Sequence, residues 1–154
     1  MIQDLTDGQM EHLLKTRPFG RLGCGSGEKL YIVPLSFVYD GQYIYGHARE
    51  GMKIDLMRKH SKVCFQVDEI QNMNEWWSII IQAEYEELTE GPFKEEAERL
   101  LRDRLAIYSP SAALRPAPAG PYMTGHREKA TLPIVFRLKI IEKTGKMEFI
   151  PRDK

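Results

Sequence analysis

The dipeptide Asp40-Gly41 is the feature that most constrains the fold, because a strand-like segment stands on each side of it. Phe37-Val38-Tyr39 precedes the dipeptide, and Tyr43-Ile44-Tyr45 follows it. Both central residues of a type I′ turn need positive φ, a conformation that Asp and Gly tolerate. The sequence therefore predicts a β-hairpin at this point, and antiparallel pairing of the strands around it.

Further segments have strand character. We predict strands over residues 19–24, 30–39, 63–67, 76–87 and 134–141, and a last short strand over 147–150 after a turn at Lys143-Thr144-Gly145-Lys146. The continuous apolar run Ile79-Ile80-Ile81 indicates a strand that is covered on both faces. Trp76 and Trp77 are adjacent, so a strand directs their side chains to opposite faces.

Three helices accompany these strands. Thr6-Asp7-Gly8-Gln9 has the form of a capping box, and the helix that follows should end before Pro18. A basic helix opens near Lys53, and a third helix begins at Pro92 with an apolar stripe behind it. The proline-rich segment 108–132 has no clear period and predicts a long loop. This order predicts one domain over residues 1–154 with a mostly β (α+β) fold, a small antiparallel barrel flanked by helices.

Composition excludes several classes of function. The chain has 154 residues and no net charge, which argues against nucleic acid as a partner. Its first residues lack the basic start and apolar run of a signal peptide, and no stretch has the roughly 20 apolar residues that span a bilayer. We therefore expect a cytoplasmic protein that binds neither nucleic acid nor a membrane.

The cysteines, histidines and glycines match no metal or dinucleotide motif. Cys24 and Cys64 are far apart in sequence and are expected to be reduced, and the histidines are too scattered to indicate a metal site. The glycines at 20, 23, 25 and 27 precede Glu28 and a strand, whereas a dinucleotide fingerprint lies between a strand and a helix. Gly25-Ser26-Gly27 is better explained as a hairpin turn.

Residues 45–59 form a candidate anion site. A strand ends at Tyr45, a tight segment from Gly46 to Gly51 carries His47 and Arg49, and a helix opens with Lys53. The first N–H groups of a helix are unpaired and lie at the positive end of its dipole, so Arg49 and Lys53 beside them could bind a phosphate. A solvated helix start whose charges bind nothing is the alternative.

Three motifs together are similar to a known family. They are Asp40-Gly-Gln-Tyr-Ile-Tyr-Gly-His47, Glu50-Gly-Met-Lys53 and Val63-Cys-Phe-Gln-Val-Asp68. In order and spacing they resemble the FMN-binding split-barrel proteins related to pyridoxamine 5′-phosphate oxidase, and most closely the nitroimidazole-resistance branch. The resemblance implies a split β-barrel, an antiparallel Greek-key barrel flanked by helices, that forms a homodimer with FMN in the subunit interface.

The same resemblance implies roles for individual residues. The backbone of Pro34-Leu35-Ser36 would run along the flavin ring, and His47, Ala48 and Arg49 would lie near the ribityl chain and phosphate. Lys53 occupies the phosphate-binding lysine position of the family. Trp77 and Ser78 would come from the neighbouring subunit.

By resemblance, the expected activity is that of an oxidoreductase that reduces a small acceptor, such as a nitro-aromatic compound, with a nicotinamide as a possible donor. Val33-Pro-Leu-Ser-Phe37 stands where vitamin B6 oxidases carry an arginine, so oxidation of pyridoxamine 5′-phosphate is not expected. No side chain has the pattern of a dedicated acid, base or nucleophile. The alternatives are a non-catalytic protein that stores or senses flavin, and a haem-handling relative with His47 or His126 as ligand.

Overall fold

The computed structural model describes residues 1–108 and 133–151. Its helices are α1 (Asp7–Thr16), α2 (Met52–Lys59) and α3 (Pro92–Tyr108). Its strands are β1 (Gln3–Asp4), β2 (Phe19–Ser26), β3 (Lys29–Ser36), β4 (Val38–Tyr39), β5 (Tyr43–Ala48), β6 (Lys62–Asn72), β7 (Glu75–Leu88) and β8 (Ile134–Phe149). The predicted loop over 108–132 and His126 lie outside the described residues, apart from Tyr108 at the end of α3.

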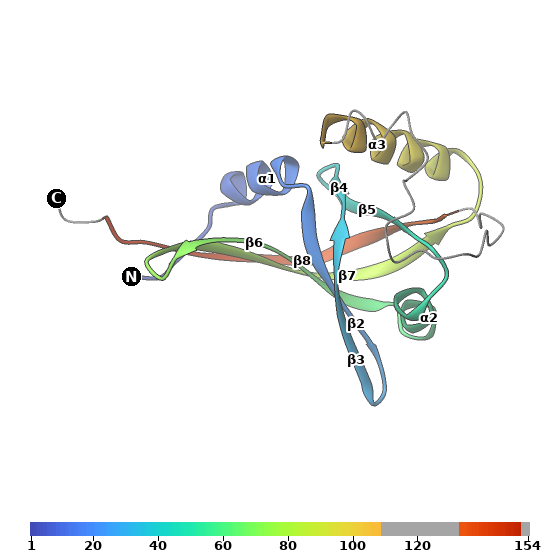
Figure 1. Ribbon diagram of the computed structural model, residues 1–154, viewed down its shortest axis with the longest axis horizontal. Helices are drawn as coiled ribbons and strands as arrows, with labels where there is room; N and C mark the ends of the chain where they lie inside the picture. Colours follow the sequence, from blue (N-terminus) through green and yellow to red (C-terminus); the bar gives the residue numbers. More distant parts are fainter. Residues whose placement is uncertain (109–132, 152–154) are drawn as a thin grey trace, which may run out of the picture.

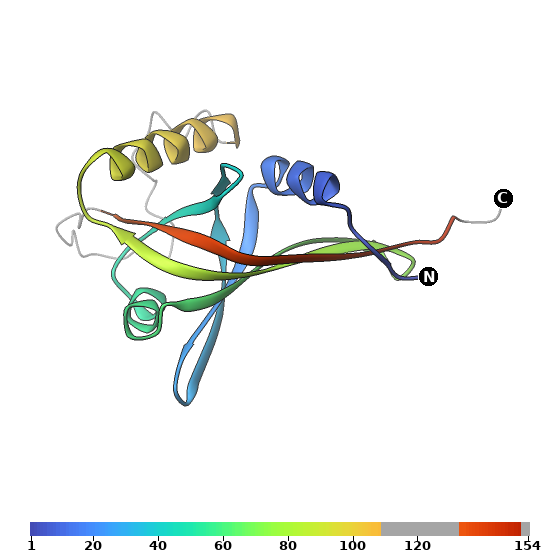
Figure 2. The same cartoon turned by 180° about the vertical axis from the view of Figure 1, so that it is seen from behind.

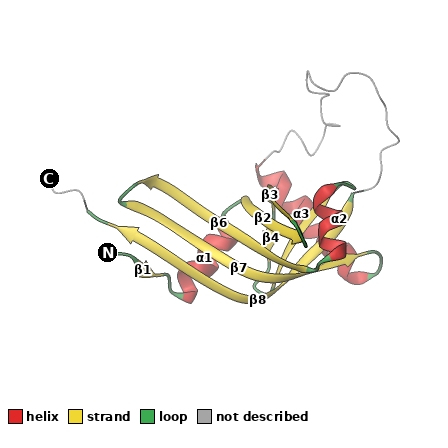
Figure 3. Cartoon of the chain, turned by 90° about the horizontal axis from the view of Figure 1, so that it is seen from below, coloured by secondary structure: helices red, strands yellow, loops and turns green. Residues whose placement is uncertain are grey.

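All strand pairs in the described part of the chain are antiparallel, and they form one strongly bent sheet in the order β3-β2-β6-β7-β8-β5-β4, with β1 beside β8. The long strands β6, β7 and β8 lie side by side, while β2 and β3 cross them and project as a hairpin (Figures 1 and 3). Helices α1 and α3 lie on one side of this arrangement, and α2 lies beside the base of the hairpin (Figures 1 and 2). The predicted mostly β split barrel with flanking helices is confirmed.

The interior of the barrel is filled by alternate residues of its strands. Phe37, Phe65 and Phe136 are among the largest buried side chains, and the Phe37 and Phe65 rings meet edge to face at a centroid distance of 5.0 Å. Burying a side chain of this size contributes roughly 1.5–3 kcal/mol. Burial of these alternating apolar side chains is therefore a principal source of the protein's stability.

The prediction that residues 79–81 are covered on both faces is wrong for the single chain. Ile79 and Ile81 are fully buried, but Ile80 is 43 % exposed on the outer face of β7. An apolar run shows that a strand avoids water, but it does not show which neighbour excludes the water.

The hairpin at Asp40 is confirmed, but its turn is not type I′. Tyr39 pairs with Ile44, and Asp40 N donates to Tyr43 O, so Gly41 and Gln42 are the central residues. Only Gly41 has positive φ, +102°, as in a turn with glycine at the first central position. The Asp40 carboxylate accepts from the N–H groups of Gln42 and Tyr43 at 2.8 Å, which explains its place before the turn.

The predicted turn at residues 143–146 is also wrong, because β8 continues from Ile134 to Phe149. Gly145 pairs with Ile79 and accepts a hydrogen bond from Leu5 N at 3.0 Å. A Cβ at this position would lie 2.7 Å from Leu5 Cδ1 and 2.9 Å from Met10 Sδ. The glycine allows the N-terminal segment to pack closely on the sheet, and it does not reverse the chain.

Helix α1 begins as predicted. Thr6 Oγ1 accepts from Gln9 N at 3.2 Å, and the Gln9 side chain accepts from Thr6 N at 2.8 Å, so both halves of the capping box are present. The helix ends at Thr16, ahead of Pro18. Among the described helices, none has the length and apolar composition to cross a bilayer.

Candidate functional site

The predicted anion segment lies between the end of β5 and the start of α2. Gly51 is the N-cap of α2, forms no side-chain cap and accepts from Asp55 N at 3.0 Å. The N–H groups that follow Gly51 begin the helix, so they have no partner one turn earlier within it.

Three side chains of different elements gather beside this helix start. Lys53 lies close enough to His47 on β5 and to Cys24 on β2 for its charge to lower the pKa of both groups. Burial is the larger effect on each: it lowers the pKa of His47 and raises the pKa of the Cys24 thiol, which stays protonated at neutral pH. The site therefore contains a cation, a neutral imidazole and a neutral thiol.

His47 brings an unused polar atom into this group. Its Nδ1 is buried and has no hydrogen-bond partner among the described residues. Buried nitrogen atoms are nearly always paired, so an unpaired one at a proposed binding site indicates a position for a ligand atom or water. A neutral imidazole can donate or accept there according to its tautomer.

Strand β3 adjoins the same region through Leu35. Leu35 and Ala48 are buried, and a Cβ on Gly46 would lie 3.3 Å from Leu35 Cδ2. Pro34 pairs with Arg21 and Ser36 with Phe19, so both lie on the opposite, outer face of the sheet. The structure thus brings Leu35 against Gly46, whereas Pro34 and Ser36 face away and Arg49 is exposed on the connection to α2.

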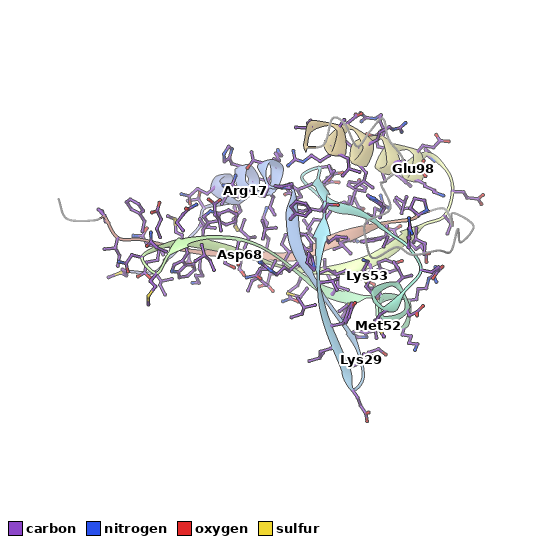
Figure 4. All side chains as sticks on the ribbon, viewed as in Figure 1. Arg17, Lys29, Met52, Lys53, Asp68 and Glu98 are labelled. Carbon is purple, nitrogen blue, oxygen red and sulfur yellow. The ribbon has the colours of Figure 1, made fainter. Side chains whose placement is uncertain are left out.

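Trp77 and Ser78 are not brought to this group within one chain. Ser78 pairs with Asp68 and accepts from the Gln66 amide at 3.0 Å, while Arg17 lies over the Trp77 ring at 5.4 Å. Asp68, the partner of Ser78, lies on the side of the sheet near α1, whereas Lys53 belongs to α2 (Figure 4). The expectation that a second subunit supplies these residues stays a prediction.

The sequence reasoning missed a groove of about 690 Å³ on the outer face, where the projecting hairpin meets β6, β7 and β8. Its lining includes Gly23, Cys64, Ile141 and Ile32, which is 72 % exposed. Ile141 is the extra residue at an irregularity between Gln82 and Ala83 in the pairing with β8. The alternation of glycine with larger residues over 20–25 could have indicated this groove, but the same pattern also fits a hairpin turn.

In residues 1–108 and 133–151, no group of three His, Cys, Asp or Glu side chains is arranged to hold a metal ion. Cys24 is buried, Cys64 is half-buried, and both are free thiols as predicted.

Comparison with known proteins agrees with this architecture. The family model described as pyridoxamine 5′-phosphate oxidase matches residues 6–147. A protein of Rhizobium meliloti (strain 1021) is 33 % identical over 102 residues, which are 64 % of this chain and 67 % of that protein.

Two solved structures are informative. A FAD-binding protein of Mesorhizobium loti is 26 % identical, with a TM-score of 0.70 and 96 % of each chain covered. A protein of Bacteroides thetaiotaomicron described as a 5-nitroimidazole antibiotic resistance protein has a TM-score of 0.68 at 15 % identity, with 96 % of this chain and 87 % of that chain covered, and shows likeness of fold alone. From the match over residues 6–147, this chain belongs to the pyridoxamine 5′-phosphate oxidase family, as its motifs predict.

Proposed function

We propose that this chain is an FMN-dependent oxidoreductase that reduces a small acceptor at a flavin held between two subunits. The observation that carries the proposal is the group at the start of α2. There α2 begins without a side-chain cap, Lys53 lies close enough to His47 to lower its pKa, and the buried His47 Nδ1 has no hydrogen-bond partner among the described residues. A phosphate monoester fits such a site, because backbone N–H groups and a lysine favour an anion.

The residues present fit FMN in three ways. Lys53, Arg49 and the N–H groups after Gly51 would hold the phosphate, His47 would meet a polar atom of the ribityl chain, and the β3 backbone at Leu35 would lie along the ring. FMN supplies hydride or electron transfer when bound, so the protein needs no acid or nucleophile of its own. These residues bind and orient the cofactor, and the apolar strands around them exclude water.

A homodimer is proposed because the outer face of the sheet exposes apolar side chains. Phe19, Ile32 and Ile80 expose apolar side chains on the outer face of the sheet, and Phe19 and Ile32 are 64 % and 72 % exposed. Clustered exposed apolar residues on one face are typical of an interaction surface. A second copy on this face would exclude water from Ile80 and supply Trp77 and Ser78.

The acceptor is proposed as a small planar molecule, with nitro-aromatic compounds as the first class to test and a nicotinamide as donor. The Val33–Phe37 segment offers no arginine for a substrate phosphate, so pyridoxamine 5′-phosphate is not the proposed substrate. The similar Mesorhizobium loti protein is described as FAD-binding. FAD is therefore tested beside FMN.

An absorption spectrum of the purified protein, followed by titration with FMN and FAD, tests the proposal. Flavin bands or saturable FMN binding are expected, with turnover when a nicotinamide donor and an acceptor are added. Binding without turnover would favour storage or sensing. A Soret band that His47→Ala abolishes would favour haem, and a colourless protein that binds no flavin would contradict the proposal.

A further inference from the structure

Arg58, in the last turn of α2, holds two carboxylates that belong to different elements. Its Nη1 and Nη2 donate to the two oxygens of Glu50 at 2.9 and 3.0 Å. Its Nε and Nη2 donate to the two oxygens of Glu87 at 3.0 and 2.6 Å. Glu50 lies on the connection between β5 and α2 and Glu87 lies near the end of β7, so the guanidinium ties the connection to the sheet.

The connection, residues 49–51, has few other anchors. Gly51 provides no side-chain cap, and the Arg49 side chain is exposed. Two parallel bonds to each carboxylate restrict both its distance and its orientation, which a single contact does not. Arg58 is therefore the side chain that determines where Glu50, and the backbone on either side of it, can lie.

The charge of Glu50 gives this arrangement a second consequence. Glu50 stands between Arg49 and Gly51, directly before the N–H groups that would hold a phosphate. A free carboxylate at that place would repel a phosphate dianion. Because Arg58 engages both oxygens of Glu50, it compensates part of this negative charge, which it shares with Glu87, and holds the carboxylate towards β7.

We propose that Arg58 is a positioning residue for the flavin phosphate: by binding Glu50 and Glu87 together, it holds the 49–51 connection in the phosphate-binding conformation and weakens the repulsion between Glu50 and the phosphate. This inference rests on the proposed function. Arg58 itself does not contact the cofactor in the proposed complex. It acts through the connection that carries Arg49 and Gly51.

The test compares two probes, FMN and riboflavin, which differ only in the phosphate. Arg58→Ala should weaken FMN binding by about 5- to 30-fold, the range that one or two kcal/mol of lost interaction produces. Riboflavin binding should be unchanged, since riboflavin has no phosphate to be placed. The thermal unfolding midpoint should move little, because Arg58 is 39 % exposed and exposed ion pairs add little to stability.

Three further variants sharpen the comparison. Arg99→Ala is a matched control, since Arg99 is also an exposed arginine bound to two carboxylates, Glu96 and Asp103, but both lie within α3. It should leave both affinities unchanged. Arg58→Lys should restore FMN binding only in part, because an ammonium cannot form parallel pairs with two carboxylates. In a Glu50→Gln background, Arg58→Ala should cost less, because no carboxylate is released.

Several results would overturn the proposal. Equal loss of FMN and riboflavin binding in Arg58→Ala would show a general structural role, and unchanged FMN binding would show no role. Full rescue by Arg58→Lys would show that only the positive charge matters, and not the paired hydrogen bonds to the two carboxylates. If Arg58→Ala does not fold, the Arg58→Lys variant carries the same two-probe comparison. A wild-type protein that binds neither flavin would instead refute the proposed function itself.

Discussion

At the scale of single residues, Lys53 is the side chain on which the candidate site depends most. It influences His47 on β5 and Cys24 on β2, so one ammonium lies close to two strands and to the start of its own helix. Lys59, on the same helix, is exposed.

Lys53→Ala should weaken FMN binding by about 1.5–3 kcal/mol, the value for a hydrogen bond to a charged group. Isothermal titration calorimetry measures the change directly. Lys59→Ala is the control on the same helix and should bind FMN like the wild type. Equal affinity of wild type and Lys53→Ala would remove the lysine from the site.

His47 should make stability depend on pH in a defined direction. Burial, and secondly the charge of Lys53, lower its pKa in the folded state below 6.5. As pH falls from 6.5 towards that lowered pKa, the unfolded state takes up the proton first, and stability is lost. Urea denaturation over this range should show the loss in the wild type and a smaller loss in His47→Asn. Parallel pH profiles would show that His47 is not a buried neutral imidazole.

At the scale of elements, the N-terminal segment and α1 are fitted to β8 through close contact at Gly145. Leu5 and Met10 approach the glycine so closely that no side chain fits between them and the strand. Arg137, on β8, likewise connects separate elements of the fold. It is buried between the Tyr43 and Phe93 rings, at 4.1 and 4.7 Å, and donates to Glu86 at 2.7 and 3.1 Å.

Gly145→Val should destabilise the protein by about 1–3 kcal/mol, the usual cost of adding volume to a packed contact. Gly8→Ala is a useful contrast, because a Cβ on Gly8 meets nothing within 4 Å and the residue lies in α1. That change should stabilise by roughly 0.5–1 kcal/mol through helix propensity. Urea denaturation midpoints measure both, and a neutral Gly145→Val would contradict the packing account.

At the scale of the whole molecule, the proposed homodimer would cover the exposed apolar face of the sheet and bring Trp77 and Ser78 of a second copy to the flavin. Ile80→Glu should produce monomers and reduce flavin binding together, because a buried unpaired charge opposes association. Ile107→Glu, on the exposed side of α3, should do neither. Analytical ultracentrifugation with flavin absorbance detection gives both readings. Monomeric Ile80→Glu that retains flavin would contradict a site between subunits.

Local chemistry by itself determined much of this protein. The Thr6–Gln9 capping box, the hairpin at Gly41, the helix starts after Gly51 and at Pro92, and the motif similarity over residues 40–68 could all be read from neighbouring residues. Their causes are short-range: hydrogen bonds within a turn, allowed φ values and apolar alternation. The family prediction followed from these motifs and was confirmed by the match over residues 6–147.

Other features depend on contacts between residues that are distant in sequence, and only the tertiary structure determined them. Gly145 looks like a turn residue, but Leu5 and Met10, remote in sequence, require a glycine inside a continuous strand. The Ile79–Ile81 run predicts burial on both faces, but the single chain covers only one. The meeting of Cys24, His47 and Lys53, and the double binding of Arg58 to Glu50 and Glu87, depend on strand register and helix placement. Residue order along the chain does not contain these distances, so only the packed barrel reveals them.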